Sequence, residues 1–205
     1  MSIQNHALID HSGGWRPAIG LALVALLAMG LLYSLAGAGL GRMLFPWQAT
    51  GSLVERDGKA AGSFLVAQPF VADGYFQARP SAADYDPMAA AGSNLARSNP
   101  ELRRRIVDTR AAVAAREGIA PEAVPIELVT QSGSGLDPHI TPAGARMQVA
   151  RVAHARGLDV ARVERLVEQH TEGPQFGLLG QPRVDVLALN LALDAAQGAP
   201  PGGAQ

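Results

Sequence analysis

An uncharged apolar run near the N-terminus constrains this chain more than any other feature. It extends over 23 residues, from Ala18 to Leu40, and has an arginine on either side. A helix of that length spans about 34 Å, more than the roughly 30 Å of a bilayer's hydrocarbon core. Trp15 and Trp47 near its ends are side chains typical of the membrane–water interface. The sequence therefore predicts a transmembrane helix over residues 17–44, after a short N-terminal segment of residues 1–16.

A secretory signal peptide is the alternative interpretation of the same run. Ala36-Gly37-Ala38 resembles a small-residue cleavage site, and Arg16 would supply the basic region. The run is longer than a usual signal core and this cleavage site lies late, so we expect the helix to stay attached. Basic residues do not decide the orientation, because long domains cross the membrane largely regardless of a few charges.

Composition excludes several classes of protein. The chain has 205 residues, a net charge of −1 and no cysteine. The balanced charge gives no general attraction to nucleic acid, and the lack of thiols excludes disulfides, thiol catalysis and cysteine-ligated metals. Hydrophobic residues make up 48% of the chain, which is enough to build a core. We expect residues 45–197 to fold as one soluble domain and residues 198–205 to form a flexible tail.

Turn and capping residues in this region predict a single α+β domain. Two strands flank the turn at Asp57-Gly58, a third is expected at Tyr75–Pro80, and a buried one at Val124–Thr130. After an irregular segment, residues 81–100, capping residues mark the helices. These helices run from Asn99 to Gly118, from Thr141 to Gly157, after Asp159, and from Leu187 to Ala196 behind a short strand at Val184 and Val186.

A glycine-containing loop is the candidate functional site. Its candidate residues are Gln131, Ser132, Gly133, Ser134, Gly135, Asp137 and His139. Ser134 lacks the Gly-x-Ser-x-Gly pattern of a hydrolase, and the chain lacks the Gly-x-x-x-x-Gly-Lys pattern of a phosphate-binding loop. We interpret the loop as a structural turn or a partner contact, in which Gly133 and Gly135 adopt conformations closed to other residues. A membrane-anchored extracytoplasmic hydrolase that uses Ser134 and His139 is the alternative.

Two further clusters have ordinary structural interpretations. His170 lies between Glu168 and Glu172, but one imidazole and two mobile carboxylates give no selective metal geometry, so we expect no metal site. Residues 103–105 are three consecutive arginines, and we expect them to form the solvated face of a helix and not a phosphate site.

A series of short stretches then follows one order behind the membrane helix. They are Tyr75-Phe76-Gln77-Ala78-Arg79-Pro80-Ser81, Gly92-Ser93-Asn94-Leu95, Ser98-Asn99-Pro100, residues 132–140, residues 148–153, Gly180, Pro182-Arg183-Val184, Val186-Leu187 and Leu189-Asn190. In this order the chain resembles the C subunit of the Kdp potassium-transporting P-type ATPase over nearly its whole length. The departures are Ala90-Ala91 in place of Ser-Gly, Ala96-Arg97 in place of Gly-Pro, and Asp185 in place of Asn.

The resemblance implies a non-catalytic accessory subunit of an ATP-driven, high-affinity potassium importer. Such a subunit stabilises the complex and acts as a catalytic chaperone that raises the ATP affinity of the pump subunit. The implied partners are a channel-like potassium-conducting subunit, a phosphorylating P-type pump subunit and a small single-helix subunit, all in a lipid bilayer. The implied location is the bacterial inner membrane, with a single pass, a cytoplasmic N-terminus and a periplasmic C-terminal domain.

The resemblance also bears on cofactors. We expect none of the chain's own; potassium is carried by the partner subunits, and ATP is implied by the family role. Residues 131–135 are similar to a glycine signature proposed to contact nucleotide, and Gly92, Ser93 and Asn94 form a second candidate loop. A periplasmic domain meets no ATP and the chain has no phosphate-binding loop, so direct binding and partner contact both stay open as roles of the first loop.

Overall fold

The computed structural model describes residues 14–56 and 58–197, which fall into two compact units divided between Gly51 and Ser52. The first unit is dominated by one long helix from Trp15 to Leu44, long and apolar enough to cross a membrane. Its consecutive parts are α1 (Trp15–Ala25), a π-helical stretch η1 (Leu26–Leu32) and α2 (Tyr33–Leu44), and the short α3 (Pro46–Ala49) follows. The expected long apolar helix is therefore present, and its length and composition fit a membrane-spanning helix.

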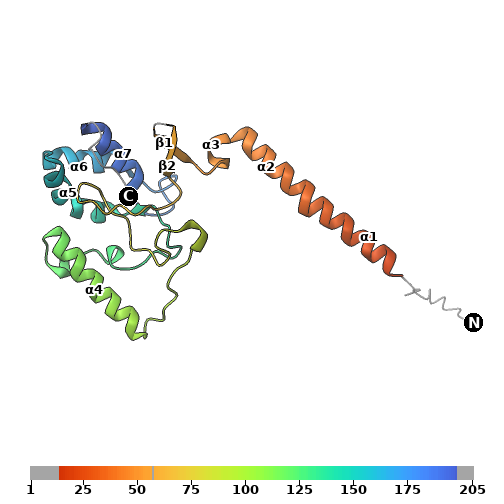
Figure 1. The fold of residues 1–205 in the computed structure, drawn as a ribbon, viewed down its shortest axis with the longest axis horizontal. Helices are drawn as coiled ribbons and strands as arrows, with labels where there is room; N and C mark the ends of the chain where they lie inside the picture. The colour runs from red at the N-terminus through yellow and green to blue at the C-terminus, as the bar shows by residue number, and fades with distance from the viewer. Residues whose placement is uncertain (1–13, 57, 198–205) are drawn as a thin grey trace, which may run out of the picture. The chain divides into compact units, whose positions relative to one another are not determined.

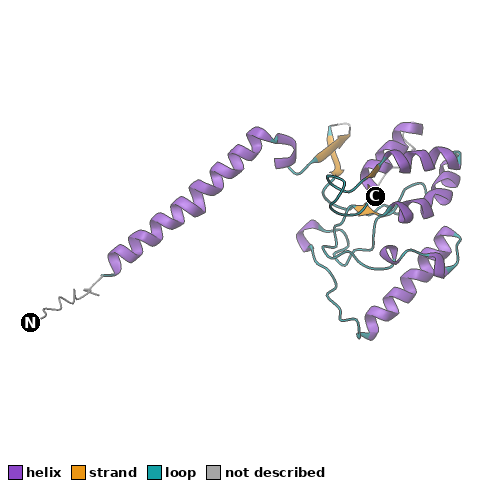
Figure 2. Cartoon of the chain, turned by 180° about the vertical axis from the view of Figure 1, so that it is seen from behind, coloured by secondary structure: helices purple, strands orange, loops and turns teal. Residues whose placement is uncertain are grey.

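The second unit mixes helices with two small sheets, which confirms the α+β class (Figures 1 and 2). β1 (Leu53–Arg56) and β2 (Lys59–Ser63) form the expected antiparallel hairpin. The other sheet has the order β3-β5-β4, with both pairs antiparallel. Its strands are β3 (His139–Ile140), β4 (Thr171–Glu172) and β5 (Arg183–Asp185), of which only β5 was expected, because two-residue strands leave no alternating pattern.

The strand expected at Tyr75–Pro80 is wrong, because side-chain amides and not a neighbouring strand bond its backbone. The Phe76 amide donates to Asn190 Oδ1 at 2.8 Å, and Asn190 Nδ2 donates back to the Phe76 carbonyl at 2.9 Å. Gln148 does the same for Gln77, accepting at 2.8 Å and donating at 3.0 Å. The segment is irregular, and it is fastened to α5 and α7 by two buried amide side chains.

The strand expected at Val124–Thr130 is also wrong. The chain there makes a short 3₁₀ turn, η4 (Ile126–Leu128), which Pro125 precedes. Another 3₁₀ turn, η3 (Pro121–Ala123), begins with a proline and lies just before this segment. Proline has no N–H to donate to a sheet, and its fixed φ suits the start of a turn. The apolar side chains of Leu128 and Val129 are nevertheless buried, so the hydrophobic pattern indicated burial and not a strand.

The four expected helices of the domain are confirmed, and their capping residues do what the sequence indicated. They are α4 (Pro100–Glu117), α5 (Pro142–Arg156), α6 (Val160–Gln169) and α7 (Val186–Gln197). Asn99, Thr141 and Asp159 accept hydrogen bonds from the backbone of the first turns. Gly118 and Gly157 end α4 and α5 in the left-handed conformation. A further 3₁₀ turn, η2 (Pro87–Ala89), interrupts the irregular segment before α4.

The core of the domain lies among α5, α6, α7 and the three-stranded sheet. Its fully buried side chains include Phe76, Val152, Val163, Val167, Val184, Leu189 and Leu193. α4 contributes Val113 and Ala114 near its C-terminal end, and it packs against η3 and α5. The expected flexible tail, residues 198–205, lies outside the described residues. The core includes Val129 and Ile140, the residues on either side of the segment that holds the glycine loop.

Candidate functional site

The glycine loop, residues 131–139, connects η4 to β3. Ser132, Gly135 and Pro138 are buried, whereas Gly133 and Ser134 are exposed. The segment before the irregular region holds it in place: the Ser132 amide donates to the Pro80 carbonyl at 3.1 Å. Gln131 Nε2 donates to the carbonyl of Ser81 at 3.0 Å, and the Ser81 hydroxyl donates to the carbonyl of Gly135 at 2.6 Å. Most of the loop is therefore bound into the domain.

Only one of the two glycines needs to be glycine for conformational reasons. Gly135 has φ +72°, and a Cβ there would lie 2.7 Å from the Ala91 carbonyl oxygen and 3.0 Å from Ala83 Cβ. Gly133 has no positive φ, and a Cβ on it would have nothing within 4 Å. The expectation is therefore right for Gly135 and wrong for Gly133, whose backbone any residue could adopt.

The structure brings the two candidate loops together, which the sequence did not reveal. A Cβ on Gly92 would lie 2.7 Å from the carbonyl oxygen of Gly133, so the backbones of the two loops are in direct contact. Ser93 Oγ accepts a hydrogen bond from Arg105 Nη2 at 3.1 Å, and Asn94 has φ +49°. The second loop, Gly92 to Asn94, thus packs against the first and is bonded to α4 through Arg105.

Asp137 and His139 form a polar cluster at the end of the loop. His139 Nδ1 lies 3.4 Å from Asp137 Oδ1, and Arg79 Nη1 lies 3.2 Å from Asp137 Oδ2. The hydrogen bonds from the His139 side chain and backbone and the charge of Arg79 outweigh burial and lower the pKa of Asp137. His139 and Asp137 are therefore partners of each other. The Asp137 side chain also accepts from the His139 amide at 3.1 Å, so it shapes the turn into β3.

Asp185 lies opposite His139 in the β3–β5 pairing. It accepts a hydrogen bond from the Ala188 amide at 2.7 Å, so it caps the first turn of α7. Burial raises the pKa of Asp185 above its ordinary value, although the capping bond and His139 act in the opposite direction. Asp185 is therefore an ionisable side chain in a partly desolvated position at the start of α7.

Ser134 is not arranged as a nucleophile. Its Oγ accepts a hydrogen bond from the Leu136 amide at 3.1 Å, and within the described residues no hydrogen bond joins it to His139. A hydrolase needs its nucleophile and base within hydrogen-bond reach of each other. The arrangement favours a turn stabilised by Ser134 over the hydrolase alternative.

The remaining candidate side chains have local partners. His170 is the C-cap of α6, and its Nδ1 lies 2.9 Å from the Leu166 carbonyl. Across residues 14–56 and 58–197 no group of three His, Cys, Asp or Glu side chains could hold a metal ion. Arg103 and Arg104 are exposed, as expected of a solvated face. Arg105 differs, because it is half-buried against Ser93.

A buried ionic network near the site was missed by sequence reasoning. The carboxylate of Glu117, at the end of α4, is fully buried between Arg116 Nε at 2.7 Å and Arg151 Nε at 3.0 Å. Arg151 also donates to the carbonyl of Tyr75 at 3.0 Å. Asp194 on α7 pairs with Arg156 at 2.9 Å. Charged side chains are rarely buried, and no spacing in the sequence marks which of the arginines would be.

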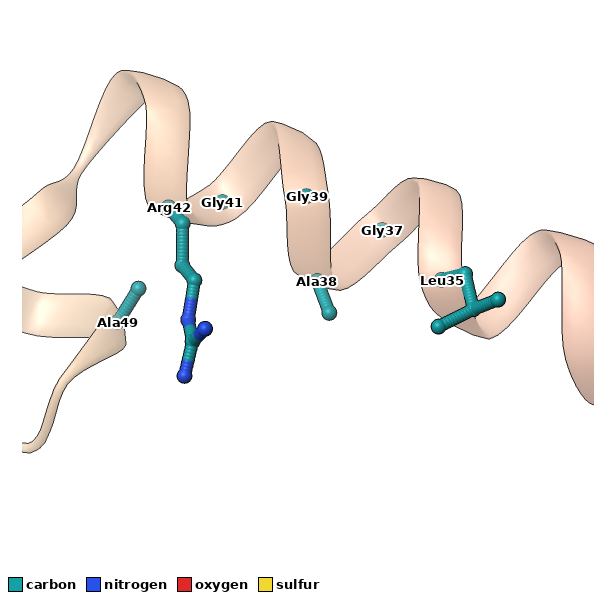
Figure 3. A pocket seen from close by; sticks show the side chains of 7 residues that line it. All are labelled: Leu35, Gly37, Ala38, Gly39, Gly41, Arg42 and Ala49. Carbon is teal, nitrogen blue, oxygen red and sulfur yellow. The ribbon is translucent and has the colours of Figure 1, made fainter.

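The first unit carries an open hollow where α2 and α3 meet (Figure 3). Its lining residues are Leu35, Gly37, Ala38, Gly39, Gly41, Arg42 and Ala49. The three glycines leave this part of the helix surface without side chains, as small residues do at contacts between membrane helices.

Comparison with known proteins assigns the family. The family model described as "K+-transporting ATPase, c chain" matches residues 15–195. Relatives named potassium-transporting ATPase KdpC subunit include one from Xanthomonas campestris pv. campestris (strain B100), 62% identical over 93% of this chain and 91% of its own. Another from Shewanella putrefaciens (strain CN-32 / ATCC BAA-453) is 53% identical over 84% and 87%. One from Salmonella heidelberg (strain SL476) is 50% identical over 90% and 97%. This chain therefore belongs to the c-chain family of the K+-transporting ATPase, as an accessory subunit of the pump and not its catalytic one.

Proposed function

We propose that this subunit stabilises the potassium pump and raises the pump subunit's apparent affinity for ATP by contact between proteins, without binding the nucleotide itself. The observation that carries the proposal is the hydrogen bonding of the backbone amides in the glycine loop. Its amides at Ser132, Gly135 and Leu136 donate to Pro80, Ser132 and Ser134 within the domain. A phosphate-binding nest needs several amides pointing together at the ligand, and these three are already used.

The charge around the loop supports the same conclusion. Asp137 lies beside the loop with a lowered pKa, so it carries a negative charge at neutral pH. Arg79 is paired with that carboxylate. A triphosphate would therefore meet little net positive charge here, whereas nucleotide sites present lysine, arginine or a metal to the phosphates.

The proposed setting is a bacterial inner membrane, crossed once by the helix Trp15–Leu44, with the domain on the periplasmic side. The proposed partners are a channel-like subunit that conducts potassium, a phosphorylating P-type subunit and a small single-helix subunit. Potassium is carried by those partners. A domain separated from cytoplasmic ATP could influence nucleotide affinity only through the conformation of the assembly.

The test is to purify the complex with and without this subunit and to measure the KM for ATP of potassium-stimulated hydrolysis. We expect a complex without the subunit to be less stable and to have a higher KM, whereas the purified subunit alone gives no saturable binding of ATP in calorimetry. An equal KM in both complexes contradicts the chaperone role. Saturable ATP binding by the subunit alone contradicts the protein-contact mechanism.

A further inference from the structure

The connection between β4 and β5 presents three apolar side chains to solvent. Phe176 is 83% exposed, Leu178 86% and Leu179 60%. We call residues 174–180 the apolar loop. The ten residues from Gly173 to Pro182 include no charged side chain. Exposed large side chains scattered singly need no explanation, but three of them at the tip of one uncharged hairpin indicate an interaction site.

The apolar loop is held in one conformation by its own backbone. The Gln175 amide donates to the Leu179 carbonyl at 2.8 Å, and the Leu179 amide donates back at 2.9 Å. The Gly177 amide donates to the Pro174 carbonyl at 3.0 Å. At the base of the hairpin Arg183 and Glu172 form an ion pair at 2.8 Å. The loop is therefore organised before it meets a partner, which lowers the conformational entropy lost on binding.

Phe176 also has a strained backbone. Its φ is +55°, a left-handed conformation that an aromatic residue rarely adopts, and Gly177 follows with φ +74°. The domain gains nothing from Phe176 in its own core, because the ring is exposed. Strain kept at an exposed aromatic residue is typical of a functional contact.

We propose that the apolar loop docks into an apolar recess on another subunit of the same potassium pump. This inference rests on the function proposed above. Three side chains cover far less than the roughly 800 Å² per partner that a stable independent interface buries, so the loop does not support a dimer of this chain by itself. A small contact is sufficient between proteins already held in one membrane, because their effective concentration is on the order of millimolar.

The length of the connecting segment favours this occupant. Only eight residues separate Leu44, at the end of α2, from Leu53, at the start of β1. Even fully extended they reach about 28 Å, so the domain stays beside the subunits embedded in the same bilayer. The lipid surface is a weaker candidate, because the loop has none of the Trp, Tyr, Lys or Arg that anchor segments at the membrane interface.

The first test places the photo-crosslinking residue p-benzoylphenylalanine at Phe176 in the full complex, in native membranes. We expect an adduct with another pump subunit. The same residue at Val107, exposed on α4, is the control for collisions on the surface and should give little adduct. A lipid adduct alone, a dimer of this chain alone, or equal adducts from both positions would overturn the proposal.

The second test measures how much partner protein co-purifies in mild detergent. Leu178→Ser is expected to lower the recovered partner subunits by about tenfold, whereas Val107→Ser leaves recovery unchanged. Thermal unfolding of each purified variant checks that the domain is folded. We expect both variants to be folded, because both side chains are exposed. Unchanged recovery with Leu178→Ser overturns the docking site while the accessory function stands. If no partner subunits co-purify with the unaltered chain, both the docking site and the proposed function are contradicted.

Discussion

At the scale of single residues, Gly135 is the position at which the site tolerates least change. Gly135→Val should lower the free energy of unfolding by more than about 2 kcal/mol, since its φ is positive and its Cβ meets Ala91 and Ala83. Gly133→Val is the matched control, because its Cβ meets nothing and its φ is not positive; we expect a change below about 1 kcal/mol. Urea unfolding of the purified chains measures both. Equal losses of stability at the two positions would show that the positive φ of Gly135 and its contacts with Ala91 and Ala83 do not cause the destabilisation.

Asp185→Asn is expected to stabilise the protein at neutral and alkaline pH. Burial raises the pKa of Asp185, so above that pKa the ionised carboxylate costs the folded state free energy. Asparagine keeps an oxygen for the Ala188 amide and carries no charge. We expect a Tm about 1–3 °C higher near pH 8.

The gain from Asp185→Asn should disappear at low pH. Below the ordinary pKa of aspartate the carboxyl is neutral in the folded and unfolded states alike, so the variant removes no charge. Thermal unfolding near pH 8 and near pH 3 distinguishes this explanation from a general effect of the amide. A Tm gain of the same size at both pH values would argue against buried charge as the cause.

At the scale of elements, the ion network of Glu117 joins α4 to α5. Arg151→Ala should lower the free energy of unfolding by about 3 kcal/mol or more, because it leaves the buried Glu117 carboxylate without one of its two arginines. Arg104→Ala removes an exposed ion pair with Asp108 and should change the free energy of unfolding by less than about 0.5 kcal/mol. Denaturant unfolding of the two variants is the measurement. Similar losses would mean that burial does not distinguish these pairs.

At the scale of the whole molecule, the orientation of the domain can be tested because the chain has no cysteine. A cysteine in place of Glu164, exposed on α6, should react with a membrane-impermeant maleimide in intact spheroplasts. A cysteine in place of Ser12, before the membrane helix, should react only after lysis. The reverse pattern would place the domain in the cytoplasm and contradict the proposed topology.

The attachment of the anchor is tested separately. We expect the intact mass of the purified protein to include Trp15, because the 23-residue apolar run is too long for a usual signal core. A mature chain that starts near Gly39 would show that the helix is a cleaved signal peptide.

Features that depend on neighbouring residues can be predicted from the sequence alone. The membrane helix follows from an unbroken apolar run, and α4, α5 and α6 begin and end at local signals such as Asn99 and Gly118. The β1–β2 hairpin follows from its turn. The family followed from the order of motifs, because many short matches in one order are specific even where each alone is weak.

Features that depend on residues far apart in the chain are visible only in the folded structure. The segment at Tyr75–Pro80 looked like a strand, but Asn190 and Gln148, distant in sequence, supply its hydrogen-bond partners. Likewise Gly92 reaches Gly133 only because the irregular segment folds back over the loop. Local propensity cannot anticipate such contacts, since their energy depends on which distant groups the core brings within hydrogen-bond reach.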